Sequence, residues 1–294
     1  MTPSTDGNVP RAAAWLLLGV CGGLVLDLCA KQVLEDYSLT QFVLVRSTIA
    51  ILIMLMLAPR FGGLDALRTQ EAGWHFLRSL LAIGAMFGFF YGLAHMPLVN
   101  ALTLGYTAPL IVTVLSAVVL GDKIGWRRWS AVIMGFVGVL VMLRPGQQAM
   151  SFAEVAVLVA AACYASQAIT ARKLSGTEST LSLSLYVIFG PLVVAAIFID
   201  ADAWTTPDTT GWILMTGAAI GSVIAWIGFI NGYRSVSPAT LAPLEYVALV
   251  GGAIAGYLLW DEVPDRWVVI GAVIIIGSGL FIVYRSEASE ECNP

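Results

Sequence analysis

Four ionisable side chains fall inside long apolar stretches of this sequence. They are Asp27, Lys31, Arg46 and Glu245. Within a lipid bilayer a charged side chain costs about 2.5–3.5 kcal/mol on insertion scales, so each must be paired or face water. Asp27 and Lys31 lie one helical turn apart, and we expect both to form a local charge network with Arg46. Such a network serves either as a structural ion-pair cluster or as the polar wall of an outer vestibule.

Glu245 differs from these three, because its own predicted helix carries no basic residue that can pair with it. Its neighbour Tyr246 has a counterpart in Tyr106, 140 residues earlier. Two interpretations of Glu245 stay open. It either exchanges a proton that drives transport, or it hydrogen-bonds backbone groups freed near Pro238 and Pro243.

Polar and aromatic side chains at membrane depth complete the predicted site. Aromatic rings offer stacking faces, and the tips of Tyr and Trp offer hydrogen bonds. The predicted substrate cavity is lined by Tyr91, Asn100, Tyr106, Tyr164, Gln167, Trp226, Asn231, Glu245 and Tyr246. Taken singly, each also fits core packing or the aromatic belt of a membrane protein. His75 and His95 are isolated, and we expect neither a metal site nor a cofactor.

Composition places these residues in a membrane. Hydrophobic residues make up 59% of the 294 residues and charged residues only 12%, and the mean hydropathy is +0.86. A soluble domain does not need so much apolar surface. The net charge of −4 is too small to suggest nucleic acid as a partner. The sequence therefore predicts an all-α integral membrane protein whose partners are the lipid bilayer and a small-molecule substrate.

Ten apolar segments of about 20 residues, the length needed to span a bilayer, fill the chain. The predicted helices are residues 12–34, 39–58, 74–95, 98–120, 129–143, 151–173, 180–199, 210–234, 237–260 and 267–284. Residues 12–144 and 151–284 form the two predicted five-helix units, joined by the linker 145–150. Residues 1–11 and 285–294 are the predicted tails.

The two units repeat each other at a distance of 140 residues. Gly88, Phe89, Gly92, Leu104, Tyr106 and Ala108 match Gly228, Phe229, Gly232, Leu244, Tyr246 and Ala248. Because each unit has an odd number of crossings, the second must be inverted relative to the first, and the binding site is expected between them. One chain is then sufficient, and we expect a monomer.

Orientation follows from the basic residues, because cytoplasmic loops keep the excess of Lys and Arg. Eleven basic residues lie on the side of the N-terminus and three on the other. The eleven are Arg11, Arg60, Arg68, Arg78, Lys123, Arg127, Arg128, Arg172, Lys173, Arg234 and Arg285, against Lys31, Arg144 and Arg266. Both termini are therefore predicted to be cytoplasmic.

Glycines spaced by four recur along these helices, which predicts close helix packing. The pairs and triplet are Gly19/Gly23, Gly84/Gly88/Gly92, Gly217/Gly221, Gly228/Gly232 and Gly252/Gly256. The four cysteines, Cys21, Cys29, Cys163 and Cys292, are far apart and are expected to be ordinary small core residues.

With these features the chain resembles the drug/metabolite transporter superfamily, and within it the ten-helix EamA type. The matching marks are Arg46, Pro109, Leu244-Glu245-Tyr246, Gly121-Asp122 and Asp261-Glu262. More narrowly, the chain is similar to the YddG-type exporters of aromatic amino acids. The resemblance implies a bacterial inner-membrane protein with a central cavity opened alternately to each side, and with the fifth and tenth helices outside the ring that encloses it.

The resulting prediction is export of amino acids and related small metabolites by alternating access. Two alternatives stay open: a proton-coupled exporter of toxic aromatic or cationic drugs, and a membrane scaffold that transports nothing. An enzyme is not expected, because the sequence lacks H-E-x-x-H, G-x-S-x-G and P-loop motifs.

Overall fold

The computed structural model describes residues 9–61, 63, 69, 71–119, 121, 125–144, 150–174, 178–200, 204–235, 244–245 and 247–290. Across these ranges the regular structure is entirely helical. Seven helices are long and apolar enough to cross a membrane, and three shorter apolar helices, Trp129–Leu143, Val247–Trp260 and Arg266–Ser278, accompany them. The prediction of a helical membrane protein with about ten crossing segments is confirmed.

Within the described residues, the first half of the chain forms six helices and the second half five. They are α1 (Val9–Asp36), α2 (Leu39–Leu57), α3 (Ala72–His95), α4 (Leu98–Gly105), α5 (Ala108–Val119), α6 (Trp126–Leu143), α7 (Phe152–Leu174), α8 (Thr180–Phe198), α9 (Thr209–Ser235), α11 (Val247–Trp260) and α12 (Arg266–Glu290), with a 3-10 turn at Ala58–Phe61. Serine side chains cap two starts: Ser38 accepts a hydrogen bond from the Gln41 amide, and Ser179 from the Ser182 amide.

The predicted helix 98–120 is wrong as one continuous element, because the chain breaks between α4 and α5. Pro109 has no N–H to donate to the Gly105 carbonyl, and its ring crowds that carbonyl. The Thr107 hydroxyl instead donates to the Leu104 carbonyl at 2.7 Å. Of the predicted helix 237–260, the structure describes a 3-10 turn at residues 244–245 and α11, which begins at Val247.

Several predictions fall outside the described part of the chain. They concern Arg68, Asp122, Lys123, Pro238, Pro243, Tyr246, Cys292 and the linker residues 145–149, together with the side chains of Arg127, Arg128, Arg172, Arg234 and Arg285.

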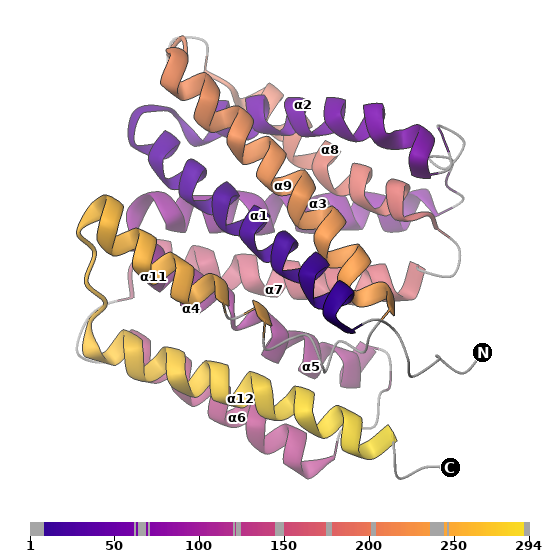
Figure 1. Ribbon diagram of the computed structural model, residues 1–294, viewed down its shortest axis with the longest axis vertical. Helices are drawn as coiled ribbons and strands as arrows, with labels where there is room; N and C mark the ends of the chain where they lie inside the picture. The colour runs from indigo at the N-terminus through magenta and orange to yellow at the C-terminus, as the bar shows by residue number, and fades with distance from the viewer. Residues whose placement is uncertain are drawn as a thin grey trace.

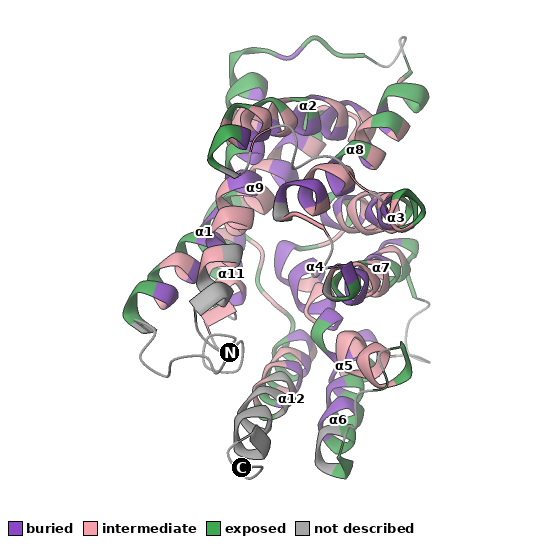
Figure 2. Ribbon diagram, turned by 90° about the vertical axis from the view of Figure 1, so that its right-hand side faces the viewer, coloured by how far each residue is buried: buried purple, intermediate pink, exposed green. Residues whose placement is uncertain are grey.

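Helices of one half pack mainly against helices of the other. In Figure 1, α1 crosses α9, and α3 runs beside α7. These two pairs are equivalent if α7 repeats α1 and α9 repeats α3. Helices α6 and α12 pack on each other at one end of the molecule (Figures 1 and 2), away from the other helices that pair across the halves. The start of α1 and the end of α12 lie on the same side of the bundle.

Glycines permit the close approach of α1 and α9. A Cβ added to Gly228 would lie 2.4 Å from the Cα of Gly19, and one added to Gly22 would lie 2.8 Å from the Gly221 carbonyl oxygen. Gly23 is different, since an added Cβ would meet nothing within 4 Å. The packing partner of Gly19 on α1 is therefore Gly22, and the predicted Gly19/Gly23 pair is wrong.

The outside of the bundle is apolar. Met56, Phe76 and Val118 expose 77%, 74% and 74% of their side-chain surface, and Figure 2 shows exposed residues along the outer faces of the helices. Polar residues such as Gln41 and Arg46 are buried instead. This distribution suits a lipid environment, in which apolar side chains face the hydrocarbon and polar groups are satisfied internally.

Candidate functional site

The end of α4 meets the 3-10 turn that precedes α11. The Tyr106 hydroxyl, at the end of α4, donates a hydrogen bond of 2.7 Å to the carbonyl oxygen of Glu245, just before α11. The 140-residue repeat places both residues at the equivalent break of the two halves. Broken helices that meet at a repeat interface are where transporters bind substrate.

Tyr164 of α7 joins this meeting point, because its side chain interacts electrostatically with Glu245. At about 100° per residue, Tyr164 shares the face of α7 that holds Ala153 and Val157, a face distinct from that of the exposed Phe152. Ala153 and Val157 are 5% and 0% exposed, whereas Tyr164 is 62% exposed. The inner face of α7 is thus closed along its first half and open along its second, which is the half predicted to be cytoplasmic.

Open space also borders the middle of α1. Gly23 and Asp27 lie one turn apart on its inner face; Gly23 has nothing within 4 Å of an added Cβ, and Asp27 is half-buried. Towards the start of α1 the same face is buried at Val20, and towards its end at Ala30. The space is therefore confined to the centre of the helix.

Arg46 lies across from Asp27 on α2. The two side chains interact electrostatically, and Arg46 is only 4% exposed. Its Nη1 donates to the Met86 sulfur at 3.2 Å, and its guanidinium carbon lies 5.7 Å from the centre of the Phe90 ring. Its Nε has no hydrogen-bond partner.

Lys31 forms a separate cluster, so the three-residue charge network is divided. Its Nζ lies 2.8 Å from the Glu262 Oε1 and donates to the Met96 carbonyl oxygen at 3.0 Å. Glu262 Oε2 accepts the Leu98 amide at 2.7 Å. We name Lys31, Glu262, Met96 and Leu98 the outer closure, after the side of the membrane that the basic residues predict for them. It forms because Lys31 lies one turn beyond Asp27, level with the start of α4 and the end of α11.

Glu262 was not among the predicted site residues. The signal for it was present, since it follows α11 directly and matches Asp122 at the 140-residue offset. The sequence alone does not show that the Lys31 side chain reaches Glu262 and not Asp27.

Three other predicted cavity residues keep positions compatible with the site. Trp226 shares a face of α9 with buried Ser222 and is itself half-buried. Gln167 and Asn100 are half-buried on α7 and α4.

Tyr91 and Asn231 lie away from this group. The Tyr91 ring stacks on His95 at 4.1 Å and meets the Phe152 ring at 5.3 Å, and Phe152 is 72% exposed. The Asn231 amide donates back to the Ile227 carbonyl oxygen at 2.9 Å. Asn231 follows Ile220, which is 45% exposed, by three turns on the same outward face of α9. Neither side chain is brought to Tyr106 and Glu245.

A second polar cluster, unforeseen from the sequence, ties together the predicted cytoplasmic ends of α3 and α8. His75 Nε2 lies 3.1 Å from Glu178 Oε2, with both side chains buried. Glu178 also accepts hydrogen bonds from the hydroxyls of Thr69 at 2.6 Å and Ser182 at 2.9 Å. Burial raises the pKa of Glu178, but the hydrogen bonds from Thr69, His75 and Ser182 and the nearby His75 outweigh it, so the pKa is lowered overall.

Arg78 is the neighbouring buried cation, 2% exposed. In contrast to Arg46, it donates to three oxygens: the Gln167 carbonyl at 2.8 Å, the Thr170 hydroxyl at 3.2 Å and the Leu183 carbonyl at 3.3 Å. It therefore acts as a structural link between α3, α7 and α8.

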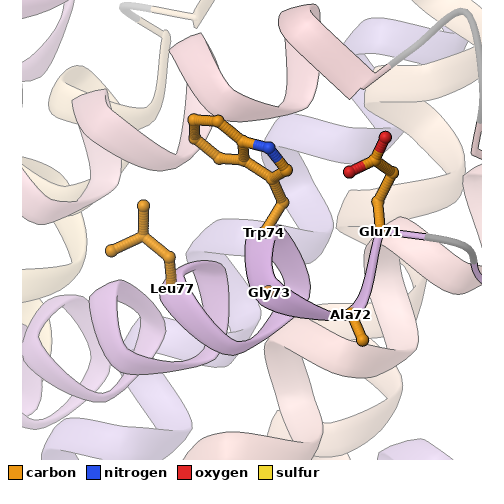
Figure 3. Close-up of a pocket in the computed structure, with 5 residues that line it drawn as sticks. All are labelled: Glu71, Ala72, Gly73, Trp74 and Leu77. Carbon is orange, nitrogen blue, oxygen red and sulfur yellow. The ribbon is translucent and has the colours of Figure 1, made fainter.

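A pocket of about 390 Å³ opens at the start of α3, where Glu71, Ala72, Gly73, Trp74 and Leu77 line it (Figure 3). It is shallow, and Lys173 caps the Trp74 ring at 4.2 Å. It contains none of the predicted cavity residues. In the described ranges, His, Cys, Asp and Glu nowhere gather in a group that could hold a metal ion.

Comparison with known proteins agrees with a transporter. The chain is 30% identical over 280 residues to an S-adenosylmethionine uptake transporter of Rickettsia prowazekii, covering 94% of this chain and 93% of the relative. It is 28% identical to a riboflavin transporter of Vibrio cholerae, covering 92% of each. It is 24% identical to a pseudopaline exporter of Pseudomonas aeruginosa, covering 86% of this chain and 88% of the relative.

A solved structure shares the fold with a TM-score of 0.66 at 17% identity, covering 96% of this chain and 99% of the other. The model of the EamA-like transporter family matches twice, at residues 11–144 and 151–284. These matches lead to one conclusion: the chain belongs to the EamA-like transporter family, whose members are transporters and not enzymes.

Proposed function

We propose that this transporter moves small zwitterionic metabolites that carry an α-amino-acid group and an aromatic ring. The observation that carries the proposal is the hydrogen bond between Tyr106 and Glu245, with Tyr164 near enough to Glu245 to interact with it electrostatically. Tyrosine rings provide stacking faces for an aromatic substrate. Glu245 and the tyrosines together favour a positive centre beside the ring.

S-adenosylmethionine is the first candidate, because it combines an adenine ring, a sulfonium cation and an α-amino-acid group. It is also the compound named for the Rickettsia relatives, at 30% identity. Aromatic amino acids, the substrates predicted from the sequence, share the ring and the amino-acid group. Both belong to the same chemical class, so one site suits either.

We further propose export by a monomer in the bacterial inner membrane. The exposed Tyr164 on the predicted cytoplasmic half of α7 favours loading from that side. The names of the relatives include both uptake and export, so direction is tested separately from substrate.

A second candidate, export of aromatic cations without an amino-acid group, is favoured by the acid Glu245 beside Tyr164. The test is uptake of labelled S-adenosylmethionine into proteoliposomes, with excess phenylalanine, tryptophan, riboflavin or tetraphenylphosphonium as competitor, with and without a pH gradient. We expect phenylalanine or tryptophan to compete. If the protein transports tetraphenylphosphonium and S-adenosylmethionine does not inhibit that transport, our proposal is refuted in favour of the second candidate. If no compound is transported at all, a scaffold is favoured.

A further inference from the structure

Arg46 is a buried guanidinium whose hydrogen-bonding capacity is mostly unused. It is 4% exposed, its Nε has no partner, and its one hydrogen bond within the described chain goes to the Met86 sulfur. Thioether sulfur is a weak acceptor, and a guanidinium has five N–H donors in a planar fork. Leaving a buried donor unpaired is costly. An oxygen-bearing anion is therefore favoured beside Arg46.

Asp27 supplies the opposite charge at the same place. It interacts electrostatically with Arg46, remains half-buried, and lies one turn from Gly23, beside which nothing lies within 4 Å of an added Cβ. A carboxylate and an under-used guanidinium thus border one open space. Together they are neutral, so a ligand that matches both charges must itself carry one of each sign.

We propose that Asp27 and Arg46 bind the α-amino-acid group of the substrate. Arg46 donates two N–H groups to the substrate carboxylate, which is the geometry its planar fork provides, and Asp27 accepts the substrate ammonium. This inference rests on the proposed function and specifies which part of the substrate these residues recognise.

The position of the aromatic part follows from the core packing. Phe90, which Arg46 approaches, belongs to the core cluster against which Tyr106 packs. We place the ring of a substrate anchored at Asp27 and Arg46 on the side of Tyr106 and Glu245. An elongated molecule such as S-adenosylmethionine reaches both groups.

The test compares three ligands: S-adenosylmethionine, its decarboxylated form, which lacks only the carboxylate, and methylthioadenosine, which lacks the whole aminocarboxypropyl chain and has a neutral thioether in place of the sulfonium. Binding to the purified full chain is measured by competition against labelled S-adenosylmethionine, or directly by thermal shift. A hydrogen-bonded charge pair is worth about 10- to 100-fold in affinity. We expect the wild type to prefer S-adenosylmethionine over the decarboxylated form by about that factor, and Arg46→Gln to reduce this preference to within about 3-fold.

Asp27→Asn tests the proposed contact between Asp27 and the substrate ammonium. It also serves as the test variant if Arg46→Gln does not fold. It should weaken S-adenosylmethionine and the decarboxylated form alike, by about 10-fold, and leave methylthioadenosine unchanged. Arg78→Gln is the matched control, because Arg78 is similarly buried and its Nε likewise has no partner, but its Nη groups donate to three oxygens. It should lower thermal stability and keep the ligand preference.

Two results would overturn the inference: equal binding of S-adenosylmethionine and its decarboxylated form by the wild type, or an unchanged preference in Arg46→Gln together with an unchanged affinity for S-adenosylmethionine in Asp27→Asn. Either leaves the proposed function standing. Binding of none of the three ligands would instead refute the proposed function itself, and the inference with it.

Discussion

The outer closure makes a quantitative prediction about conformation. Lys31 and Glu262 are 10% and 16% exposed and 2.8 Å apart, and Glu262 also accepts the Leu98 amide. The contact links α1 to the start of α4 and the end of α11, so opening towards the outside must break it. Breaking a fully buried ion pair by removing one partner costs about 3–5 kcal/mol. Because this pair is partly hydrated, and glutamine keeps a hydrogen-bond acceptor, we expect about 2 kcal/mol for Glu262→Gln.

A loss of about 2 kcal/mol from the closed state shifts the equilibrium about 30-fold towards the outward-open state. The assay places a cysteine at Ala101, which is fully buried on α4, in a chain whose four native cysteines are replaced. A membrane-impermeant maleimide is then added from the outside. We expect Glu262→Gln to raise the labelling rate at least 10-fold.

The control uses the ion pair between Arg144 and Asp265. It is also 2.8 Å long, but its side chains are 26% and 43% exposed, and it links the end of α6 to the start of α12 instead of α1 to α4 and α11. Arg144→Gln should leave labelling at residue 101 unchanged. If Glu262→Gln labels no faster than its parent while remaining folded, the closure does not hold the outer side shut, and the reasoning fails.

Three further predictions follow from the packing and the helix breaks. Glu178 has a lowered pKa, so its contribution to stability is complete above its unfolded value of about 4.5 and is lost as pH falls through the lower folded value. Glu178→Gln should therefore cost about 3 kcal/mol near pH 7 and flatten the acid side of the curve of thermal stability against pH, which an unchanged curve would contradict. Gly228→Ala, whose new Cβ would lie 2.4 Å from Gly19, should cost about 1–3 kcal/mol, whereas Gly23→Ala should leave the melting temperature the same or higher; equal melting temperatures for the two variants would refute the packing account. Tyr106→Phe removes the hydrogen bond to the Glu245 carbonyl and should weaken that junction by about 1 kcal/mol, seen as slower transport without loss of folded protein; an unchanged rate would argue against a role for the junction.

The internal repeat was the most informative feature of the sequence. Its 140-residue offset pairs Tyr106 with Tyr246, and the structure joins the two breaks through the hydrogen bond from Tyr106 to Glu245. A constant offset between matching residues predicts that they occupy equivalent positions, because both halves repeat the same arrangement of helices. It also predicted the number and type of the crossing segments.

The sequence did not predict which side chains pair with each other across helices. Lys31 lies one turn from Asp27, so spacing alone favoured their pairing. The observed partner, Glu262, comes from the end of α11, and only the packing of α1 beside α11 brings it there. The cluster of His75 and Glu178 is likewise formed by contact between segments far apart in the chain.

Other positions could have been predicted from helical phase. Asn231 lies three turns from Ile220 and Tyr91 three turns from Leu80, and Ile220 and Leu80 are 45% and 56% exposed. A count of about 100° per residue would have placed Asn231 and Tyr91 on outward faces. Residue type and depth suggested a cavity, but phase decides which side of a helix a residue occupies.

The most direct test of the central claim, alternating-access transport of aromatic zwitterions, is counterflow. Proteoliposomes loaded with unlabelled S-adenosylmethionine are diluted into labelled S-adenosylmethionine, and internal label is followed over time beside empty proteoliposomes. We predict a transient accumulation of label in the loaded vesicles that exceeds the equilibrium level, and none in the empty ones. Equal uptake by loaded, empty and protein-free vesicles would contradict the account.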